Sequence, residues 1–364
     1  MDFKITEQQK RIIEAREDNV CVLASAGTSK TFCLIERIKW LVEQGTDPKK
    51  IIAITFTRNA ATEIVQRLAP IQIGYCGTIH AYANYLLLLY GVDTKTVIEK
   101  EKFDEFFELV KDHPGCLEDI DIDHLLLDEA QDSGYNQFEF IFDMLCPRNW
   151  TVFGDMKQSI YEFNGGDPKL LQNLSNYSWV TTYNMNENFR NSRQVHGYAQ
   201  YLLGRADKGY VDNSKLMRGV EGKVITFEYN LEILADYVKS FDTFGDWFVL
   251  CRTNKEAEAA MDFLSHKGIP CDTFKQGDLT YDELQSKMRE NNVKFLTMHA
   301  SKGLQRKNVA VIGARMPGQR QRVTNKAAEE VRLAYVAATR AENMLLWLKP
   351  VATKKEKSKM SNWE

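Results

Sequence analysis

The stretch Leu125-Leu126-Leu127-Asp128-Glu129-Ala130-Gln131-Asp132 indicates both the fold of this chain and its chemistry. A continuous apolar run is typical of a buried parallel strand, and in open α/β sheets ligands bind at the carboxyl ends of such strands. Two adjacent carboxylates at that edge can divide two tasks, holding Mg²⁺ on a nucleotide and taking a proton from water. A lone Asp-Glu pair after a strand is common, so its interpretation depends on the segments that accompany it.

A second segment, Ala-Ser-Ala-Gly-Thr-Ser-Lys-Thr at residues 24–31, points the same way. It stands between a predicted strand at 20–23 and a predicted helix at 31–43, which is the context of a phosphate-binding loop. Backbone N–H groups of such a loop face the phosphates at the helix N-terminus. We expect Lys30 to bridge the β- and γ-phosphates and the Thr31 hydroxyl to bind Mg²⁺. The remaining phosphate contacts are expected from Ala26, Gly27, Thr28 and Ser29.

The loop departs from the usual pattern at two positions, because Ser29 stands where a glycine normally precedes the lysine and Ala24 replaces the first glycine. If the backbone at Ser29 has a positive φ, a serine there costs about 1–3 kcal/mol. Taken alone, the segment has an alternative interpretation as a small-residue turn before a helix.

The composition, with 44% hydrophobic and 27% charged residues over 364, is that of a soluble globular protein of about two domains. Seven scattered cysteines without a Cys-x-x-Cys pair favour a reducing, cytoplasmic compartment and argue against zinc or iron–sulfur ligation. The net charge of -3 gives no global support for nucleic-acid binding, although a local basic groove is compatible with it.

Strand-like runs alternate with helix-length segments, which predicts parallel sheets with crossover helices. The runs of a first domain are at residues 20–23, 51–56, 124–127 and 151–153. A second series begins near Trp179 and continues at 223–227, 247–251, 293–296, 309–313 and 344–348. We therefore predict domains at 1–180, with a small insertion at about 82–122, and at 181–349, followed by a mobile basic tail at 350–364.

Taken together, these segments resemble the superfamily 1 DNA helicases of the UvrD/Rep/PcrA type, in the family's order from about residue 5 to 341. Besides the two segments above, the resemblance rests on residues 5–9, 53–61, 77–80, 154–165, 188–190, 251–254, 296–304 and 332–341. The last two segments, LTMHASKGL and RLAYVAATRA, are specific even singly. The resemblance implies two RecA-like P-loop NTPase domains, each a parallel sheet flanked by helices, with ATP and Mg²⁺ as cofactors.

The family assigns roles in ATP hydrolysis to matching residues. Asp128 would hold Mg²⁺ with Thr31, Glu129 would be the general base, and Gln158 would orient the attacking water. Arg190 and Arg340 would be arginine fingers. Adenine and sugar contacts are implied for Gln9, Phe189, Gly303 and Gln305, where Gln305 replaces the usual glutamate.

The family also implies a single DNA strand, or a single/double-strand junction, as partner. Aromatic platforms hold such a strand without reading its sequence, and the matching positions are Phe56, Tyr161 and Phe163. Taken alone, each aromatic is more often a core residue than a stacking platform. Asn164 replaces the arginine that usually follows the last platform. Candidates for backbone contacts or for relaying the nucleotide state are Arg58, His80, Arg252, Thr297 and His299.

Most of the family's two inserted subdomains are missing, since His80 and His124 are about 40 residues apart and only about 26 residues separate Pro270 from the LTMHASKGL segment. The chain thus resembles a compact, phage-like version. The leading hypothesis is an ATP-dependent, 3′ to 5′ DNA translocase or helicase. The alternative is a nucleotide-gated DNA-binding or regulatory subunit with weak turnover, working with a partner nuclease or replication protein. A third hypothesis, a P-loop metabolic kinase, would leave the segments LTMHASKGL and RLAYVAATRA unexplained.

Overall fold

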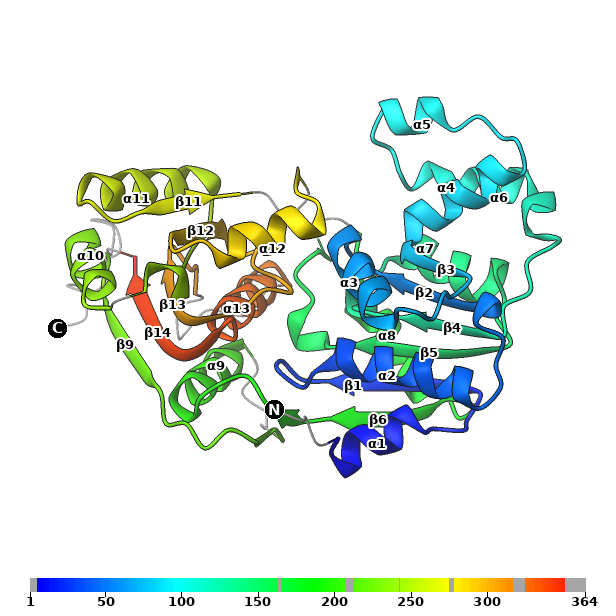
Figure 1. The fold of residues 1–364 in the computed structure, drawn as a ribbon, viewed down its shortest axis with the longest axis horizontal. Helices are drawn as coiled ribbons and strands as arrows, with labels where there is room; N and C mark the ends of the chain where they lie inside the picture. The colour runs from blue at the N-terminus through cyan, green and yellow to red at the C-terminus, as the bar shows by residue number, and fades with distance from the viewer. Residues whose placement is uncertain are drawn as a thin grey trace. The chain divides into compact units, whose positions relative to one another are not determined.

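The computed structural model describes residues 5–162, 165–206, 213–241, 243–274, 278–316 and 325–350. The chain divides into two compact units, Met1–Glu187 and Asn188–Glu364 (Figure 1). Each unit is built on one six-stranded sheet in which the paired strands run parallel. The predicted α/β fold with two parallel sheets is confirmed.

The first sheet has the strand order β3-β2-β4-β5-β1-β6, so β1 lies between two strands that come much later in the chain. The strands are β1 (Asn19–Ala24), β2 (Ile51–Thr55), β3 (Tyr75–Thr78), β4 (His124–Leu127), β5 (Asn149–Gly154) and β6 (Thr181–Met185). The strand expected to open the second domain, near Trp179, is β6, and it pairs with β1 in the first sheet.

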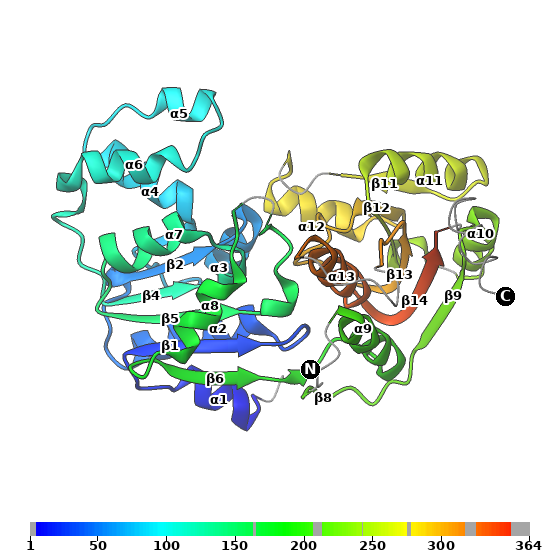
Figure 2. The same ribbon diagram turned by 180° about the vertical axis from the view of Figure 1, so that it is seen from behind.

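Helices cover both faces of this sheet because side chains of a strand alternate between its faces. Val20 and Val22 pack with Leu34 in one cluster, whereas Cys21 packs with Leu171 in the other. Figures 1 and 2 show α2 and α3 on one face and α8 on the other. The helices around this sheet include α1 (Glu7–Ile13), α2 (Lys30–Glu43), α3 (Arg58–Leu68), α7 (Tyr135–Glu139) and α8 (Pro168–Asn176).

The predicted insertion is a small helical layer at the β3 edge of the sheet (Figure 1). It consists of α4 (Ile79–Leu89), α5 (Lys95–Glu99) and α6 (Glu105–Asp112). Phe107 of α6 and Leu86 of α4 are buried in the same hydrophobic cluster. The helices of the insertion therefore share the hydrophobic core of the first unit and do not form a separate core.

The second sheet has the order β11-β12-β10-β13-β14-β9. Its strands are β9 (Lys223–Glu228), β10 (Trp247–Cys251), β11 (Cys271–Thr273), β12 (Val293–Thr297), β13 (Arg306–Ile312) and β14 (Ala341–Lys349). One face packs against α10 (Leu231–Lys239) and α11 (Asn254–His266), and α9 (Arg193–Ala206) and α13 (Asn325–Ala338) pack against β14. The other elements are α12 (Tyr281–Arg289) and a two-stranded sheet of β7 (Glu187–Asn188) and β8 (Lys215–Leu216).

Within the described ranges, no helix combines the length and the apolar character that a membrane crossing requires. The predicted tail lies outside the described residues, apart from Pro350.

Candidate functional site: a nucleotide site at the carboxyl edge of the first sheet

The segments singled out in the sequence follow neighbouring strands of the first sheet. Since β4, β5 and β1 are adjacent and parallel, their carboxyl ends share one edge. The loop before α2 follows β1, Asp128 follows β4, and the short 3₁₀ turn η5 (Met156–Gln158) follows β5. The sheet topology therefore brings together side chains that are far apart in the sequence.

The loop after β1 has the backbone of a phosphate cradle. Gly27 and Ser29 both adopt positive φ, 75° and 66°. The Thr28 hydroxyl donates to the Ser25 carbonyl oxygen at 2.8 Å, and the Ser25 N–H donates to the Met185 carbonyl oxygen of β6 at 2.9 Å. The backbone at Ser29 thus has the positive φ at which a serine is costly, because this left-handed conformation favours glycine. Ala26, beside Gly27, is buried.

Two contacts join the start of α2 to the residues after β4. Lys30 Nζ lies 3.4 Å from Glu129 Oε1, and the Thr31 hydroxyl donates to Asp128 Oδ2 at 3.3 Å. The Glu129 N–H donates to Asp128 Oδ1 at 2.9 Å, in a left-handed backbone conformation with φ of 54°. A cation, a hydroxyl and two carboxylates thus lie together at the end of the cradle.

Electrostatics at Asp128 favour a bound cation. Burial raises the pKa of Asp128 and the adjacent Glu129 raises it further, while Lys30 acts in the opposite direction. The Thr31 hydroxyl and the Asp128 carboxylate are hard oxygen donors of the kind that Mg²⁺ prefers. Their 3.3 Å separation suits two ligands of one small cation.

Gln158 belongs to a buried network that extends the site toward β5. Its Nε2 donates to Asp155 Oδ2 at 2.7 Å, and the Asp155 N–H donates to Gln131 Oε1 at 2.9 Å. Gln131 Nε2 in turn donates to Glu129 Oε2. Neither Gln131 nor Asp155 was predicted to have a role. The only available signal was the presence of uncharged and charged polar residues directly after two apolar strands.

Gln9, predicted to read adenine, is buried at the start of α1. Its Oε1 accepts from the Thr6 N–H at 3.1 Å, and the Thr6 hydroxyl accepts from the Gln9 N–H at 3.3 Å, which is a capping box. The Thr6 hydroxyl also donates to Glu187 Oε2 at 2.6 Å. The side chain of Gln9 is thus held in place by the helix cap, and its adenine contact remains a prediction.

Two of the predicted DNA platforms lie against each other. The rings of Phe56 and Tyr161 have centroids 4.7 Å apart at an interplanar angle of 31°. Both are half-buried, and exposed Arg58 begins α3 two residues after Phe56. The third platform, Phe163, lies outside the described residues together with Asn164.

His80 belongs to α4 of the insertion and packs against α6. Its Nε2 lies 2.9 Å from Asp104 Oδ1, and its ring centroid is 5.2 Å from that of Phe107. A role for His80 at DNA remains a prediction.

In the second unit, two of the predicted nucleotide residues, Arg190 and Arg340, contact Thr339, and a third, Gln305, contacts Arg190. Arg190 Nε donates to Gln305 Oε1 at 2.6 Å, and its Nη1 donates to the Thr339 carbonyl oxygen at 3.4 Å. Arg340 is 2% exposed and donates to the Thr339 hydroxyl at 3.2 Å and to the Leu304 carbonyl oxygen at 3.3 Å. Nearby in sequence, Phe189 is half-buried and Gly303 has a φ of 82°.

The remaining DNA candidates of the second unit form another group. Arg252 makes a two-pronged ion pair with Glu330 of α13, at 3.0 and 2.6 Å. Burial lowers the pKa of His299, and the neighbouring Arg252 lowers it further. Thr297 accepts from the Ala300 N–H at 3.1 Å, which fixes the turn that carries His299. Arg252 therefore has an acidic partner within its own unit.

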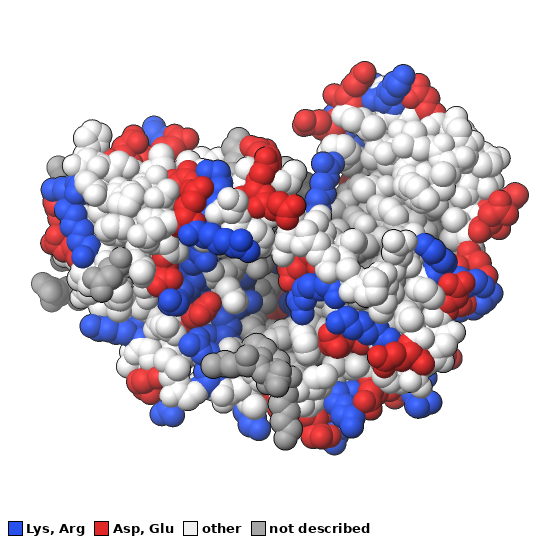
Figure 3. All heavy atoms as spheres, viewed as in Figure 1, with Lys and Arg blue, Asp and Glu red and all other residues white. Residues whose placement is uncertain are grey.

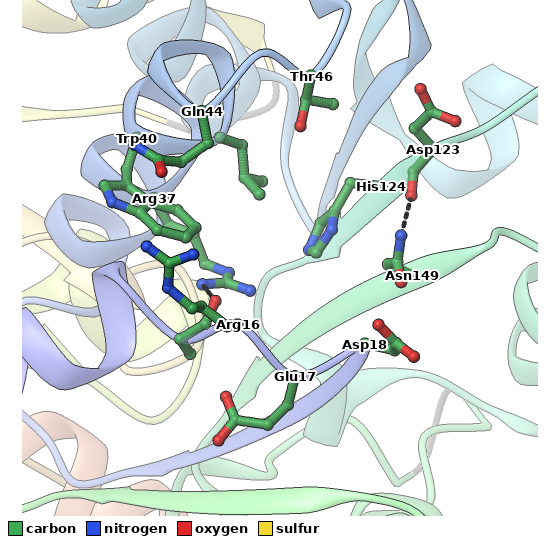
Figure 4. A pocket seen from close by; sticks show the side chains of 12 residues that line it. Arg16, Glu17, Asp18, Arg37, Trp40, Gln44, Thr46, Asp123, His124 and Asn149 are labelled. Atoms are coloured by element: carbon green, nitrogen blue, oxygen red, sulfur yellow. Dashed lines mark hydrogen bonds between the residues drawn. The ribbon is translucent and has the colours of Figure 1, made fainter.

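A separate cavity of about 390 Å³ lies at the opposite, amino edge of the first sheet (Figure 4). It is lined by Arg37 and Trp40 of α2 and by His124 and Asn149, which begin β4 and β5. Since Lys30 and Asp128 lie at the carboxyl edge, this cavity is distinct from the candidate nucleotide site.

Buried side chains beside this cavity form a hydrogen-bond chain. Arg37 Nε donates to Thr151 Oγ1 at 2.7 Å, and His124 Nε2 lies 2.9 Å from the same hydroxyl oxygen. Burial and the positive charge of Arg37 together lower the pKa of His124 to about 3, so the folded protein favours the neutral imidazole. Arg37 Nη1 also donates to the carbonyl oxygens of Ile12, Ile13 and Ala15 at the end of α1. The arrangement has a structural role, fixing α1 on the sheet.

The positive φ of Ser29 leads to a test of stability. A left-handed conformation costs a non-glycine residue about 1–2 kcal/mol, and glycine loses about 0.5–1 kcal/mol of unfolded-chain entropy. Ser29→Gly should therefore raise the free energy of unfolding by up to about 1.5 kcal/mol in urea titrations. Ser175→Gly, in the helix α8, is the matched control and should lower it. If Ser29→Gly were less stable than the wild type, the inferred backbone strain at Ser29 would be wrong.

Family comparisons agree with the order of these segments. The UvrD/REP helicase N-terminal domain matches residues 5–118 and 104–178, and the UvrD-like helicase C-terminal domain matches residues 274–349. The two matches fall in the first and second units respectively.

Individual relatives are distant in sequence. The chain is 23% identical to a probable DNA helicase of Mycoplasma pneumoniae, covering 94% of this chain and 82% of the relative. It is 22% identical to the mitochondrial ATP-dependent DNA helicase HMI1 of Saccharomyces cerevisiae, covering 78% of this chain and 55% of the relative. It is 27% identical to an ATP-dependent helicase/nuclease of a Thermoanaerobacter species, covering 41% of this chain and 16% of the relative.

The chain spans about half the length of the yeast relative and of a probable DNA helicase II homolog of Mycoplasma capricolum. The N- and C-terminal domain matches occur in family order on two parallel α/β units. The chain belongs to the UvrD/REP family of superfamily 1 helicases.

Proposed function

We propose that this protein is an ATP-dependent DNA helicase or translocase that moves 3′ to 5′ along a single strand. The observation that supports it best is the convergence of Lys30, Thr31, Asp128 and Glu129 at the end of a phosphate cradle. Family membership gives this convergence its meaning, because the relatives bear the names of DNA helicases. The 3′ to 5′ direction follows from the family resemblance alone.

The proposed hydrolysis requires a positioned water and neutralised phosphate charge. Lys30 and the N–H groups of residues 26–31 would bind the phosphates of ATP, and Glu129 would accept the proton of the attacking water. Gln158 would orient that water. Arg190 and Arg340 of the second unit are proposed as cations on the transferred phosphoryl group. Mg²⁺ held by Thr31 and Asp128 would supply further charge neutralisation.

On the DNA side, we propose Phe56 and Tyr161 as the stacking surface and Arg58 as a phosphate contact. On the face shown in Figure 3, basic and acidic side chains are interspersed over each unit, in keeping with the net charge of -3. We expect binding to depend on base stacking at Phe56 and Tyr161.

Replacing Tyr161 by alanine tests the stacking surface. Base–aromatic stacking contributes about 1–3 kcal/mol per base, so the variant should bind a short oligonucleotide about 5- to 150-fold more weakly in fluorescence anisotropy. The control is Tyr135→Ala, which removes a tyrosine ring that is 68% exposed on α7 of the same unit. Wild-type affinity in Tyr161→Ala would remove this residue from the DNA surface.

Steady-state ATP turnover with and without single-stranded DNA tests the function as a whole. DNA stimulation that is lost in Lys30→Ala would support a motor, and strand displacement on a tailed duplex would follow. Turnover that is indifferent to DNA would contradict it.

A second candidate function is a nucleotide-gated DNA-binding protein with weak turnover that works for a nuclease or replication partner. The strained Ser29 favours it, because the phosphate cradle is held in a conformation that serine adopts at a cost. The name of one distant relative pairs helicase with nuclease. A wild type that binds DNA only with ATP, and that gains turnover in Ser29→Gly, would identify this second function.

A further inference from the structure

Gln131 lies at the centre of the network that connects Glu129 with Gln158. It is completely buried in the 3₁₀ turn η3 (Ala130–Asp132), directly after Glu129. Its side-chain amide has two partners: Nε2 donates to the Glu129 carboxylate, and Oε1 accepts from the backbone N–H of Asp155, which directly follows β5. Neither contact takes part in the hydrolysis proposed above.

The orientation of the Gln131 amide is fixed by its partners. The Asp155 N–H can only donate, so the atom that it meets at 2.9 Å is Oε1. Nε2 must then face the carboxylates, where it donates to Glu129 Oε2 and lies 3.5 Å from Asp132 Oδ2. The Gln131 carbonyl oxygen also accepts from the Ser159 hydroxyl at 3.2 Å. The residue is anchored through both its backbone and its side chain.

At the end of β5, the contact between Gln131 and Asp155 has room because residue 154 is a glycine. A Cβ at Gly154 would come within 3.0 Å of Gln131 Oε1 and within 2.4 Å of Leu171 Cδ2. Glycine therefore allows β5 to pass close enough for the Asp155 N–H to reach the amide. The position of Gln131 is thus built into the end of β5 as well as into its own turn.

The two oxygens of Glu129 have different partners. Oε1 pairs with Lys30 Nζ at 3.4 Å, and Oε2 accepts from Gln131. In the proposed function Lys30 binds the phosphates of ATP. Its ion pair with Glu129 Oε1 is then weakened, because the phosphates carry more negative charge and compete for the same ammonium group. Gln131, which is buried and anchored elsewhere, can keep its bond to Oε2 with nucleotide bound.

We propose that Gln131 is a positioning residue that holds the Glu129 carboxylate toward the attacking water and ties it to the Asp155–Gln158 pair. This inference rests on the proposed ATP hydrolysis. Through Asp155, whose carboxylate accepts from Gln158 Nε2, the base and the water-orienting glutamine share one hydrogen-bonded frame. A rotation of either side chain would then be resisted by the other.

The test uses Gln131→Met, which keeps the length of the side chain but can neither donate from an amide nor hold Glu129. Hydrogen bonds to charged groups contribute about 1.5–3 kcal/mol, so kcat for DNA-stimulated ATP hydrolysis should fall about 10- to 100-fold. KM for ATP should stay within about threefold, because the phosphate contacts are untouched. Gln172→Met, on the exposed face of α8, is the matched control and should keep wild-type turnover.

A double-mutant cycle separates positioning from a general structural role. In Glu129→Asp the shorter carboxylate withdraws from Gln131, so adding Gln131→Met should lower kcat less than about threefold further. Losses that multiply in the double variant, or a Gln131→Met enzyme with wild-type kcat, would overturn the inference. If Gln131→Met does not fold, Gln131→Leu replaces it, since its side chain is also apolar and cannot donate to Glu129.

The result also distinguishes this inference from the proposed function. A wild type that hydrolyses ATP while Gln131→Met is equally active overturns the positioning role alone. A wild type without ATP turnover overturns both, because no base then needs to be positioned.

Discussion

Glu129→Gln should leave ATP binding intact and lower DNA-stimulated hydrolysis about 10²- to 10⁴-fold, the usual contribution of a general base. The glutamine keeps the shape of the side chain and an oxygen that can accept from Gln131 Nε2, but it cannot take a proton from water. Lys30, 3.4 Å away, loses an anionic partner, which favours its contact with phosphates. Nucleotide affinity should therefore be equal to or higher than that of the wild type.

The measurement pairs steady-state turnover with equilibrium binding of a fluorescent ATP analogue. Glu108→Gln removes a charge of the same sign from an exposed position of α6 and should behave as wild type. Unchanged turnover in Glu129→Gln would remove this residue as the base. A variant that loses binding instead would place Glu129 in nucleotide affinity rather than in chemistry.

Acid should destabilise the first unit through His124, whose pKa burial lowers to about 3. An ordinary histidine pKa is about 6.5. Between these two values the unfolded chain binds a proton that the folded chain excludes, so the contribution to stability is complete above about pH 6.5 and declines as the pH falls. The slope is about 1.4 kcal/mol per pH unit. From about pH 7 to about pH 5 the loss should be about 2 kcal/mol.

Urea unfolding of the wild type and of His124→Gln at several pH values between about 7 and 5 measures this effect. The substitution removes the titrating group, so the difference in free energy of unfolding between the two proteins should shrink as the pH falls. Parallel pH profiles would show that His124 accepts a proton in the folded state without cost. They would also contradict the neutral form that burial and the nearby Arg37 favour.

Buried parallel strands were the most predictable part of the fold. The ranges expected for β4 and β10 coincide with His124–Leu127 and Trp247–Cys251, because central strands buried on both faces are continuous apolar runs. The edge strands β3 (Tyr75–Thr78) and β11 (Cys271–Thr273) were not predicted. They are short and partly polar, since an edge strand has a neighbour on one side only.

The candidate nucleotide site also has a part that the sequence predicts and a part that it does not. A lysine, a threonine and two carboxylates are identified by their order in the chain, and the structure brings those four together. The part played by Gln131 depends on a contact with Asp155 across two strand exits, which no local pattern encodes. Likewise, the membership of β6 in the first sheet follows from a pairing with β1 that only the tertiary fold specifies.

The place of β1 in its sheet has a consequence for how the protein is made. Cys21, near the start of the chain, lies opposite Val152 on one side and Thr182 on the other. Before β5 and β6 have been synthesised, β1 has neither of its neighbouring strands, and the Ser25 N–H of the loop after β1 lacks its partner, the Met185 carbonyl oxygen. Pairing over such separations is slow, because a long loop must close before any contact forms. The carboxyl end of β1, which carries the candidate phosphate loop, is therefore among the last parts of the first unit to acquire structure during synthesis.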